Sequence, residues 1–330
     1  MKSHDIELGI SYYGNLYVDC LKMHIDEMID ANINAVVLAV SEYEAFNWFN
    51  RLTEIIDTFK ENNIRVYWNF WAWGGIFGGE ADSRYLHRNI TGRQVLTNGD
   101  VVPAVCFENK DFREYIKRWI YEITKETKVD GFFWDEPSFY RFSEDSWACF
   151  CDECKKKFRD SFKYDMPTQL TDDVLIFRER QILSFLADLL NATKKYRKDI
   201  SNTICLLPEN DPKIGVIDWR NVAKLSNLNV IATDPYWYLF DEDITWFREK
   251  VIELKKIAAE YNLKSQIWLQ LFYLPEEGID ELSKAVHIAI DEGIDSIFAW
   301  PFRAAEGMSI ESENPQRTWN TLKSIFKSIK

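Results

Sequence analysis

The chain has 330 residues, of which 46% are hydrophobic and 28% charged, a composition typical of a globular protein with a sizeable core. A formal net charge of −13 makes nucleic acid and anionic membrane surfaces poor partners. Residues 1–14 lack the apolar run of a signal peptide, and no stretch approaches the ~18 apolar residues of a membrane span, so we expect a cytoplasmic protein. The oligomeric state stays open, a homo-oligomer included.

Strand-like and helix-like apolar patterns alternate along the chain. Continuous or alternating apolar runs predict strands at residues 6–13, 34–40, 65–71, 129–134, 203–207, 229–233, 266–271 and 296–300. Helical spacing predicts helices at residues 17–31, 49–60, 112–124, 174–196, 216–225, 244–261, 279–291 and 316–329.

Eight strand–helix units in order predict a (β/α)8 TIM barrel, which we expect to form one domain over residues 1–330. Two connections are long, residues 74–110 after the third strand and residues 137–171 after the fourth. The alternative fold is an open doubly wound sheet, which favours a glycine-rich first turn. The first turn here is Tyr12-Tyr13-Gly14-Asn15, so the barrel is the preferred prediction.

The residues that follow the predicted strands are carboxylates, amides and aromatic rings. Because barrel enzymes carry their sites at these strand ends, we expect substrate contacts there. Histidine is missing from this set, which argues against a Ser-His system and a histidine-ligated catalytic metal. Flat rings suit the apolar face of a sugar, although the same rings would also cap a barrel. The predicted carbohydrate-binding residues are Tyr13, Glu42, Asn69, Trp71, Trp73, Tyr236, Trp237, Trp268, Gln270 and Trp300.

The segment DGFFWDEP at residues 130–137 runs from a buried strand directly into two acids. Strand alternation places Trp134 and Glu136 on one face, where the indole would desolvate the carboxyl group and raise its pKa. We therefore predict Glu136 as the general acid/base of a glycosidase, with Asp135 holding substrate hydroxyls or tuning its neighbour. The second carboxylate is Asp234 or Glu209. A solvated acidic turn, and hydroxyl-binding roles for the other acids, are the alternatives.

Three cysteines form a C-x-C-x-x-C motif, Cys149, Cys151 and Cys154, within the second long connection. Cys106 lies in the first long connection, and neighbouring barrel strands bring the two connections side by side. Four thiolates complete a tetrahedral zinc shell, so the prediction is a structural zinc ion that braces loops. Free thiols near a helix start are the alternative.

An acid pair at the end of the fourth strand, followed by this cysteine motif, resembles the family-42 β-galactosidases of glycosidase clan A. The resemblance implies a barrel, a zinc site at the four cysteines, and Glu136 as acid/base. Two positions depart from the clan pattern: Asp135 replaces an asparagine, and the seventh strand ends with Gln270 where the clan has a nucleophilic glutamate. The Asp135-Glu136 pair also resembles family-20 hexosaminidases, which implies substrate-assisted hydrolysis of a 2-acetamido sugar as an alternative.

The sequence thus predicts an O-glycosyl hydrolase acting on a carbohydrate. A non-catalytic carbohydrate-binding barrel is the rival hypothesis, motivated by Gln270 at the nucleophile position. A carboxylate-ligated metal enzyme is a third.

Overall fold

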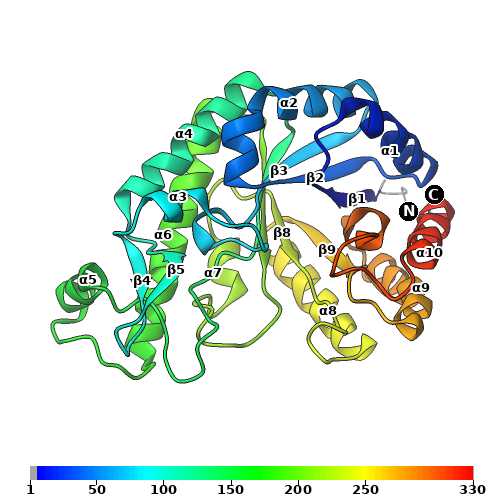
Figure 1. Ribbon diagram of the computed structural model, residues 1–330. Helices are drawn as coiled ribbons and strands as arrows, with labels where there is room; N and C mark the ends of the chain where they lie inside the picture. Colours follow the sequence, from blue (N-terminus) through cyan, green and yellow to red (C-terminus); the bar gives the residue numbers. More distant parts are fainter. Residues whose placement is uncertain (1–5, 330) are drawn as a thin grey trace.

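The computed structural model describes residues 6–329, and at its centre eight parallel strands form a closed barrel (Figure 1). Each strand pairs with its neighbours in chain order, and the last pairs with the first. This order confirms the predicted (β/α)8 fold. The strands are β1 Glu7–Tyr12, β2 Ala35–Val40, β3 Arg65–Phe70, β6 Gly131–Trp134, β7 Ser201–Leu206, β8 Val230–Thr233, β9 Lys264–Gln270 and β10 Ser296–Trp300.

Helices surround the barrel, and two of them differ clearly from the prediction. The second begins seven residues earlier than expected because Ser41 and Glu44 form a capping box at its first turn. The helix predicted at 216–225 is shorter, because only the part from Trp219 to Ala223 is helical. The helices are α1 Val18–Asp30, α2 Glu42–Glu61, α4 Lys110–Glu126, α6 Asp172–Tyr196, α7 Trp219–Ala223, α8 Ile244–Glu260, α9 Glu276–Asp291 and α10 Pro315–Ser328.

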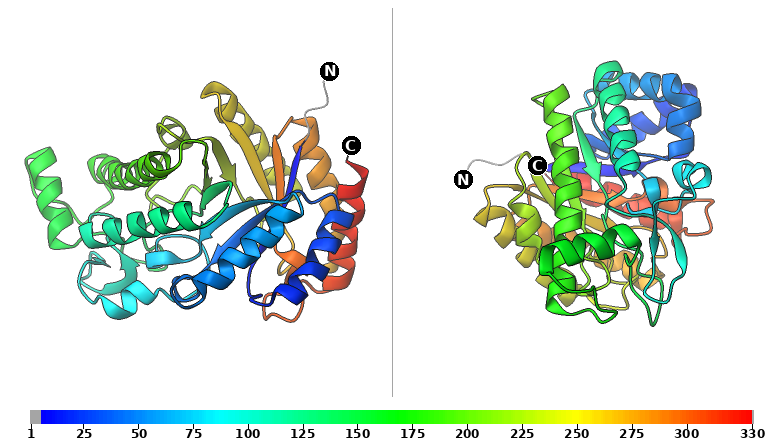
Figure 2. Two further views of the ribbon diagram at one scale, coloured as in Figure 1. Left: turned by 90° about the horizontal axis from the view of Figure 1, so that it is seen from above. Right: turned by 90° about the vertical axis from the view of Figure 1, so that its left-hand side faces the viewer.

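The two long connections contain further short elements. After β3 come the 3-10 turn Trp73–Gly75, helix α3 Arg84–Arg88 and the antiparallel pair β4 Arg93–Val95 and β5 Val101–Val105. After β6 comes helix α5 Asp152–Phe162. Figures 1 and 2 show α5 and the β4–β5 pair together at one end of the molecule, away from α1 and α10. We call these two connections, residues 71–109 and 135–171, the side lobe.

The core has two layers because successive strand residues point to opposite sides of the barrel wall. The inner layer fills the barrel and includes Val37, Phe133, Trp268 and Phe298. The outer layer lies between strands and helices and includes Trp134, which stacks on Phe70 at 4.9 Å between ring centroids. Within the described chain, no helix combines the length and apolarity that crossing a membrane requires.

Candidate active site

A cavity of about 410 Å³ opens at the carboxyl ends of the barrel strands. It collects residues from six strand ends and their loops, which is where a barrel of this kind carries its chemistry. The structure brings seven of the predicted site residues together here: Asp135, Glu136, Glu209, Asp234, Tyr236, Trp268 and Trp300.

Glu136 enters this cavity by a route that strand alternation does not predict. The strand ends at Trp134, whose ring is fully buried in the outer layer. Glu136 then adopts a left-handed backbone with φ +40°, and its N–H donates to the carbonyl of Cys205 at 3.0 Å. The expected contact between Glu136 and Trp134 is therefore wrong, because the backbone turn carries the carboxylate away from the indole and into the cavity.

Asp135 is held in place by its neighbours. The Asn69 amide donates to Oδ2 of Asp135 at 3.1 Å, and the Gly78 N–H donates to its carbonyl at 2.9 Å. A Cβ atom at Gly78 would lie only 3.0 Å from the Glu136 carboxylate and 3.1 Å from that of Asp135. Glycine at this position thus lets the loop after β3 lie directly on the acid pair. Burial, and then the charge of Glu136, raise the pKa of Asp135 well above its usual value.

Asp234 at the end of β8 is the most deeply buried acid of the cavity that makes no ion pair. Its side chain is 3% exposed, and its Oδ1 has no hydrogen-bond partner among the described residues. Burial is the main cause that raises its pKa well above the ordinary value, and the carboxyl group of Glu136 adds to the effect. A nearby carboxylate of the same charge disfavours ionisation of Asp234 in the same way as burial does.

Glu209 has a different environment, because Arg141 forms an ion pair with it. Arg141 also lies over the ring of Phe142 at 5.3 Å. Arg141 and Glu80 both line the cavity and were missed by the sequence analysis. For Glu80 a signal existed, since Gly78-Gly79 directly precedes it in the long connection after β3; for Arg141 we find none.

The aromatic wall of the cavity is supported by a stack of three rings. Trp268 and Trp300 line the cavity itself. Behind Trp300, Tyr13 stacks on it at 5.4 Å between centroids and on Trp71 at 5.1 Å from its other side. Tyr13 and Trp71 therefore support the wall. Gly79 makes this packing feasible, since a Cβ there would lie 2.0 Å from the Trp71 indole.

For three residues the predicted contact with substrate is wrong, because their polar groups form hydrogen bonds within the protein. Glu42 is buried in α2, and its carboxylate accepts from the Gly74 N–H at 2.9 Å and the Ser83 hydroxyl at 2.7 Å. Trp73 donates its indole N–H to the Val40 carbonyl at 2.8 Å, and buried Trp237 donates its own to Glu281 at 3.1 Å. All three brace loops.

Gln270 and Asn69 also serve neighbouring loops and side chains. The Gln270 amide donates to the Phe272 carbonyl at 2.9 Å and accepts from the Leu239 N–H at 3.3 Å. It therefore ties the loop after β8 to the loop after β9. Asn69 does not line the cavity itself; its amide donates to Asp135, which does.

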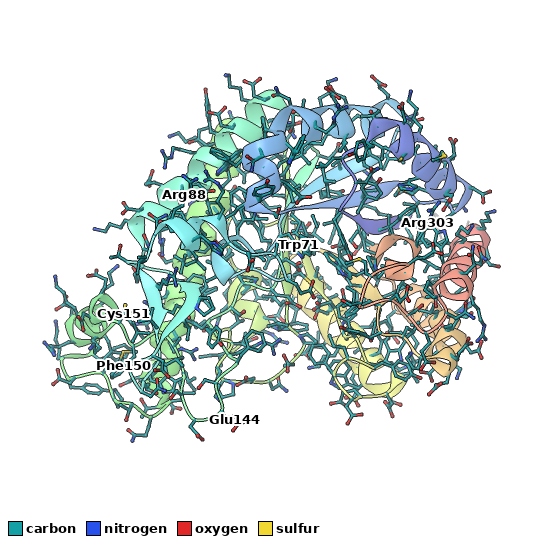
Figure 3. All side chains as sticks on the ribbon, viewed as in Figure 1. Trp71, Arg88, Glu144, Phe150, Cys151 and Arg303 are labelled. Carbon is teal, nitrogen blue, oxygen red and sulfur yellow. The ribbon has the colours of Figure 1, made fainter. Side chains whose placement is uncertain are left out.

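The four cysteines predicted as metal ligands converge in the side lobe, with all four sulfurs within 4.8 Å of one another. The sulfur of Cys106 lies 3.4 Å from that of Cys154 and 3.8 Å from that of Cys151. Tetrahedral zinc at its usual Zn–S distance separates sulfurs by roughly 3.8 Å, so the group fits such an ion. The Gln181 amide donates to the Cys154 sulfur at 3.2 Å, as second ligand shells do. Figure 3 shows Cys151 far from Trp71, so this group acts outside the cavity.

The fold is thus a (β/α)8 barrel with an acidic, aromatic cavity at its strand ends. Among solved structures the chain is similar to a β-galactosidase from Halorubrum lacusprofundi, with TM-score 0.78 and 14% identity over 98% of this chain and 58% of that one. It is also similar to a GH42 β-galactosidase from G. stearothermophilus, with TM-score 0.75 and 15% identity over 100% of this chain and 57% of that one.

A third similar structure is an endo-1,4-β-mannanase from Rhizomucor miehei, with TM-score 0.68 and 10% identity over 98% of this chain and 95% of that one. The chain spans a little over half the length of the β-galactosidases. No model of a protein family and no curated protein sequence matches it. The predicted resemblance to the family-42 barrel is confirmed for the fold.

Proposed function

We propose that this protein is a glycoside hydrolase whose substrate is a carbohydrate bound in the strand-end cavity. The observation that carries the proposal is that Glu136 and Asp234 line one cavity together with Trp268 and Trp300. Glycosidases need two carboxyl groups at the scissile bond, one of which carries a proton. The indoles offer flat apolar faces to a sugar ring. The similarity to β-galactosidases and a mannanase supports the same class of reaction.

The proposed reaction starts with one proton on the pair of carboxyl groups, because the leaving oxygen has to be protonated. Glu136 delivers this proton to the glycosidic oxygen while the bond from that oxygen to the anomeric carbon breaks. Both carboxyl groups are then ionised. A water molecule supplies the new oxygen at the anomeric carbon, and its released proton returns to the pair through Asp234. The cycle therefore ends with the pair holding one proton again.

Asp234 is preferred over Glu209 as the second carboxylate. The ion pair with Arg141 neutralises Glu209 and orients it as a ligand for a sugar hydroxyl. Gln270 at the end of β9 has no carboxyl group, and both its amide oxygen and its amide nitrogen are hydrogen-bonded to backbone groups. The second carboxylate is therefore assigned to Asp234 at the end of β8.

We also propose that the four cysteines hold a structural zinc ion. Cys106, Cys149, Cys151 and Cys154 would be its ligands, and four thiolates leave no position for substrate. The ion would fasten the connection after β3 to the connection after β6.

The test of the hydrolase proposal is a screen of aryl glycosides with wild-type protein and a Glu136→Gln variant. The amide keeps the shape of the side chain but cannot donate the proton, so kcat/KM should fall by about 10³-fold. Glu144→Gln, an exposed position in the same loop, is the matched control and should retain wild-type rates. Equal activity of Glu136→Gln and wild type would reject the assignment. Glycan binding by wild type without any product release would support the non-catalytic rival.

A further inference from the structure

The cavity carries a marked excess of negative charge. Five carboxyl groups line it, and the one basic side chain among its lining residues is Arg141. Arg141 is already paired with Glu209. Four acids then remain without a basic partner among the residues that line the cavity: Glu80, Asp135, Glu136 and Asp234.

Glu80 lies at the edge of this group and is free to meet a ligand. Burial raises the pKa of the Glu80 carboxyl, and the charge that adds to this shift is that of Glu136, which has the same sign. Gly79, which directly precedes Glu80, packs against the Trp71 indole, so Glu80 lies beside the aromatic wall. Burial, and then the charge of Glu80, raise the pKa of Tyr13 in that wall. A sugar stacked on that wall would thus present a substituent to Glu80.

Asp234 provides a second, independent indication of a ligand group. Its Oδ1 is buried, lines the cavity and lacks a hydrogen-bond donor within residues 6–329. A buried acceptor without a donor is costly unless a ligand supplies the missing hydrogen bond. Hydrogen-bond donors on the ligand are therefore required deep in the cavity as well as at its edge.

The spacing of these acids favours an organic cation over a metal ion. Within the described chain, the four cysteines are the group of possible metal ligands whose atoms all lie within 4.8 Å of one another. The carboxylates are instead distributed over the walls, from the loop after β3 to the end of β8. An ammonium group on a sugar, which donates three hydrogen bonds and carries one charge, matches this arrangement.

We propose that the substrate is an amino sugar with a free amine, whose ammonium group binds next to Glu80 and the Glu136–Asp234 pair. This inference rests on the proposed hydrolase function. Uronic acids and phosphorylated sugars are disfavoured by the same charges. Binding of the cation stabilises the ionised form of Glu80, whose pKa is raised in the free protein, so it should release protons to the buffer while the catalytic proton stays on the Glu136–Asp234 pair.

The first experiment compares three aryl glycosides that differ only at one position: free amine, N-acetyl amine and hydroxyl. Wild-type protein should cleave the free-amine compound with a kcat/KM about tenfold above that of the other two, the effect of one charge-assisted hydrogen bond. Glu80→Gln should remove most of this preference. High salt should weaken the preference in wild type, because the cavity is open to solvent.

Asp82→Asn is the matched control, since Asp82 is exposed two residues further along the same loop and lies outside the cavity lining. It should keep the wild-type preference. A preference for the hydroxyl compound, or for the N-acetyl compound as substrate-assisted hydrolysis requires, would overturn the inference. So would a free-amine preference that Glu80→Gln leaves intact.

A binding experiment separates this inference from the hydrolase proposal. Calorimetry with glucosamine, N-acetylglucosamine and glucose, repeated in buffers of different ionisation enthalpy, reports both affinity and proton release. Tighter binding of glucosamine with proton release supports the inference even if no glycoside is cleaved, in which case the hydrolase proposal alone fails. Equal binding of the three sugars contradicts the inference while leaving hydrolysis intact.

Discussion

At the scale of single residues, Asp234 couples the proposed chemistry to stability. Its carboxyl pKa is 3.8 in an ordinary setting and is raised well above that by burial in the fold. Above about pH 4 the native state therefore binds more protons than the unfolded state, and the free energy of unfolding falls as pH rises through the raised pKa. Asp234→Asn removes this dependence. We expect its melting temperature to exceed that of wild type by about 2 °C or more near pH 8.

The same pair of proteins should melt at nearly equal temperatures below about pH 3, where the Asp234 carboxyl is mostly neutral in both states. Differential scanning calorimetry across this range is the measurement, with Asp82→Asn as the exposed control. A stabilisation that does not change with pH would contradict the assigned burial effect. Activity should fall as stability rises, because the variant lacks the second carboxyl group.

The orientation and hydrogen-bond partners of single side chains are the features of the site that the sequence does not predict. The sequence predicts Glu136 as the general acid because it follows a buried strand at the barrel mouth. Its orientation was not predictable, since a non-glycine residue at φ +40° breaks the alternation that placed it over Trp134. For Glu42 the sequence indicates the position, just after a strand, but not the hydrogen-bond partners. Gly74 and Ser83, which bind its carboxylate, lie in a loop without a periodic pattern.

At the scale of secondary-structure elements, Glu42 fastens the connection after β3 to α2. Its buried carboxylate accepts hydrogen bonds from Gly74, Ser83 and Tyr85. Glu42→Gln would replace one accepting oxygen by a donor and leave a buried N–H without a partner. We expect a loss of about 1–3 kcal/mol in the free energy of unfolding. Urea titration measures this loss, and hydrogen exchange should accelerate over residues 73–88.

Glu44→Gln is the control for this prediction, because Glu44 also lies in the first turn of α2 but only closes the capping box. A glutamine can keep that contact, so its effect should stay below about 1 kcal/mol. If both variants lose the same stability, or if exchange in the loop is unchanged, Glu42 does not fasten the loop.

Long helices such as α6 and α8 were predictable because many residues of one period reinforce each other, and the barrel strands were predictable as apolar runs between them. The short ones were not. The helix Arg84–Arg88 and the strand Arg93–Val95 have too few residues for a period, and they depend on contacts with the rest of the side lobe. The early start of α2 was available from Ser41 and Glu44, a capping signal that the apolar pattern alone overlooks.

At the scale of the whole molecule, the barrel and the side lobe have different sources of stability. The barrel has a continuous apolar core in two layers. Much of the side lobe is irregular chain. Its two connections are joined by the four cysteines, by buried side chains such as Phe107 and Phe139, and by backbone hydrogen bonds such as that from the Phe150 N–H to the Val95 carbonyl at 2.7 Å. Gly79, Glu80 and Arg141 reach the cavity from this lobe. Stability of the lobe should therefore control how well the cavity is formed.

Removal of the proposed zinc ion should loosen the side lobe and leave the barrel folded. We expect about one zinc ion per chain by elemental analysis of wild type, and its loss from Cys154→Ser, which removes one of four ligands. The variant should keep the far-ultraviolet circular dichroism of the barrel helices but become sensitive to proteases within residues 89–109 and 141–170. Its KM should rise because Glu80 and Arg141 are no longer held at the cavity. Cys20→Ser, at an exposed cysteine of α1, should change none of these. A metal-free wild type whose lobe resists proteolysis as well as its barrel would show that apolar packing alone, without an ion, holds the two connections together.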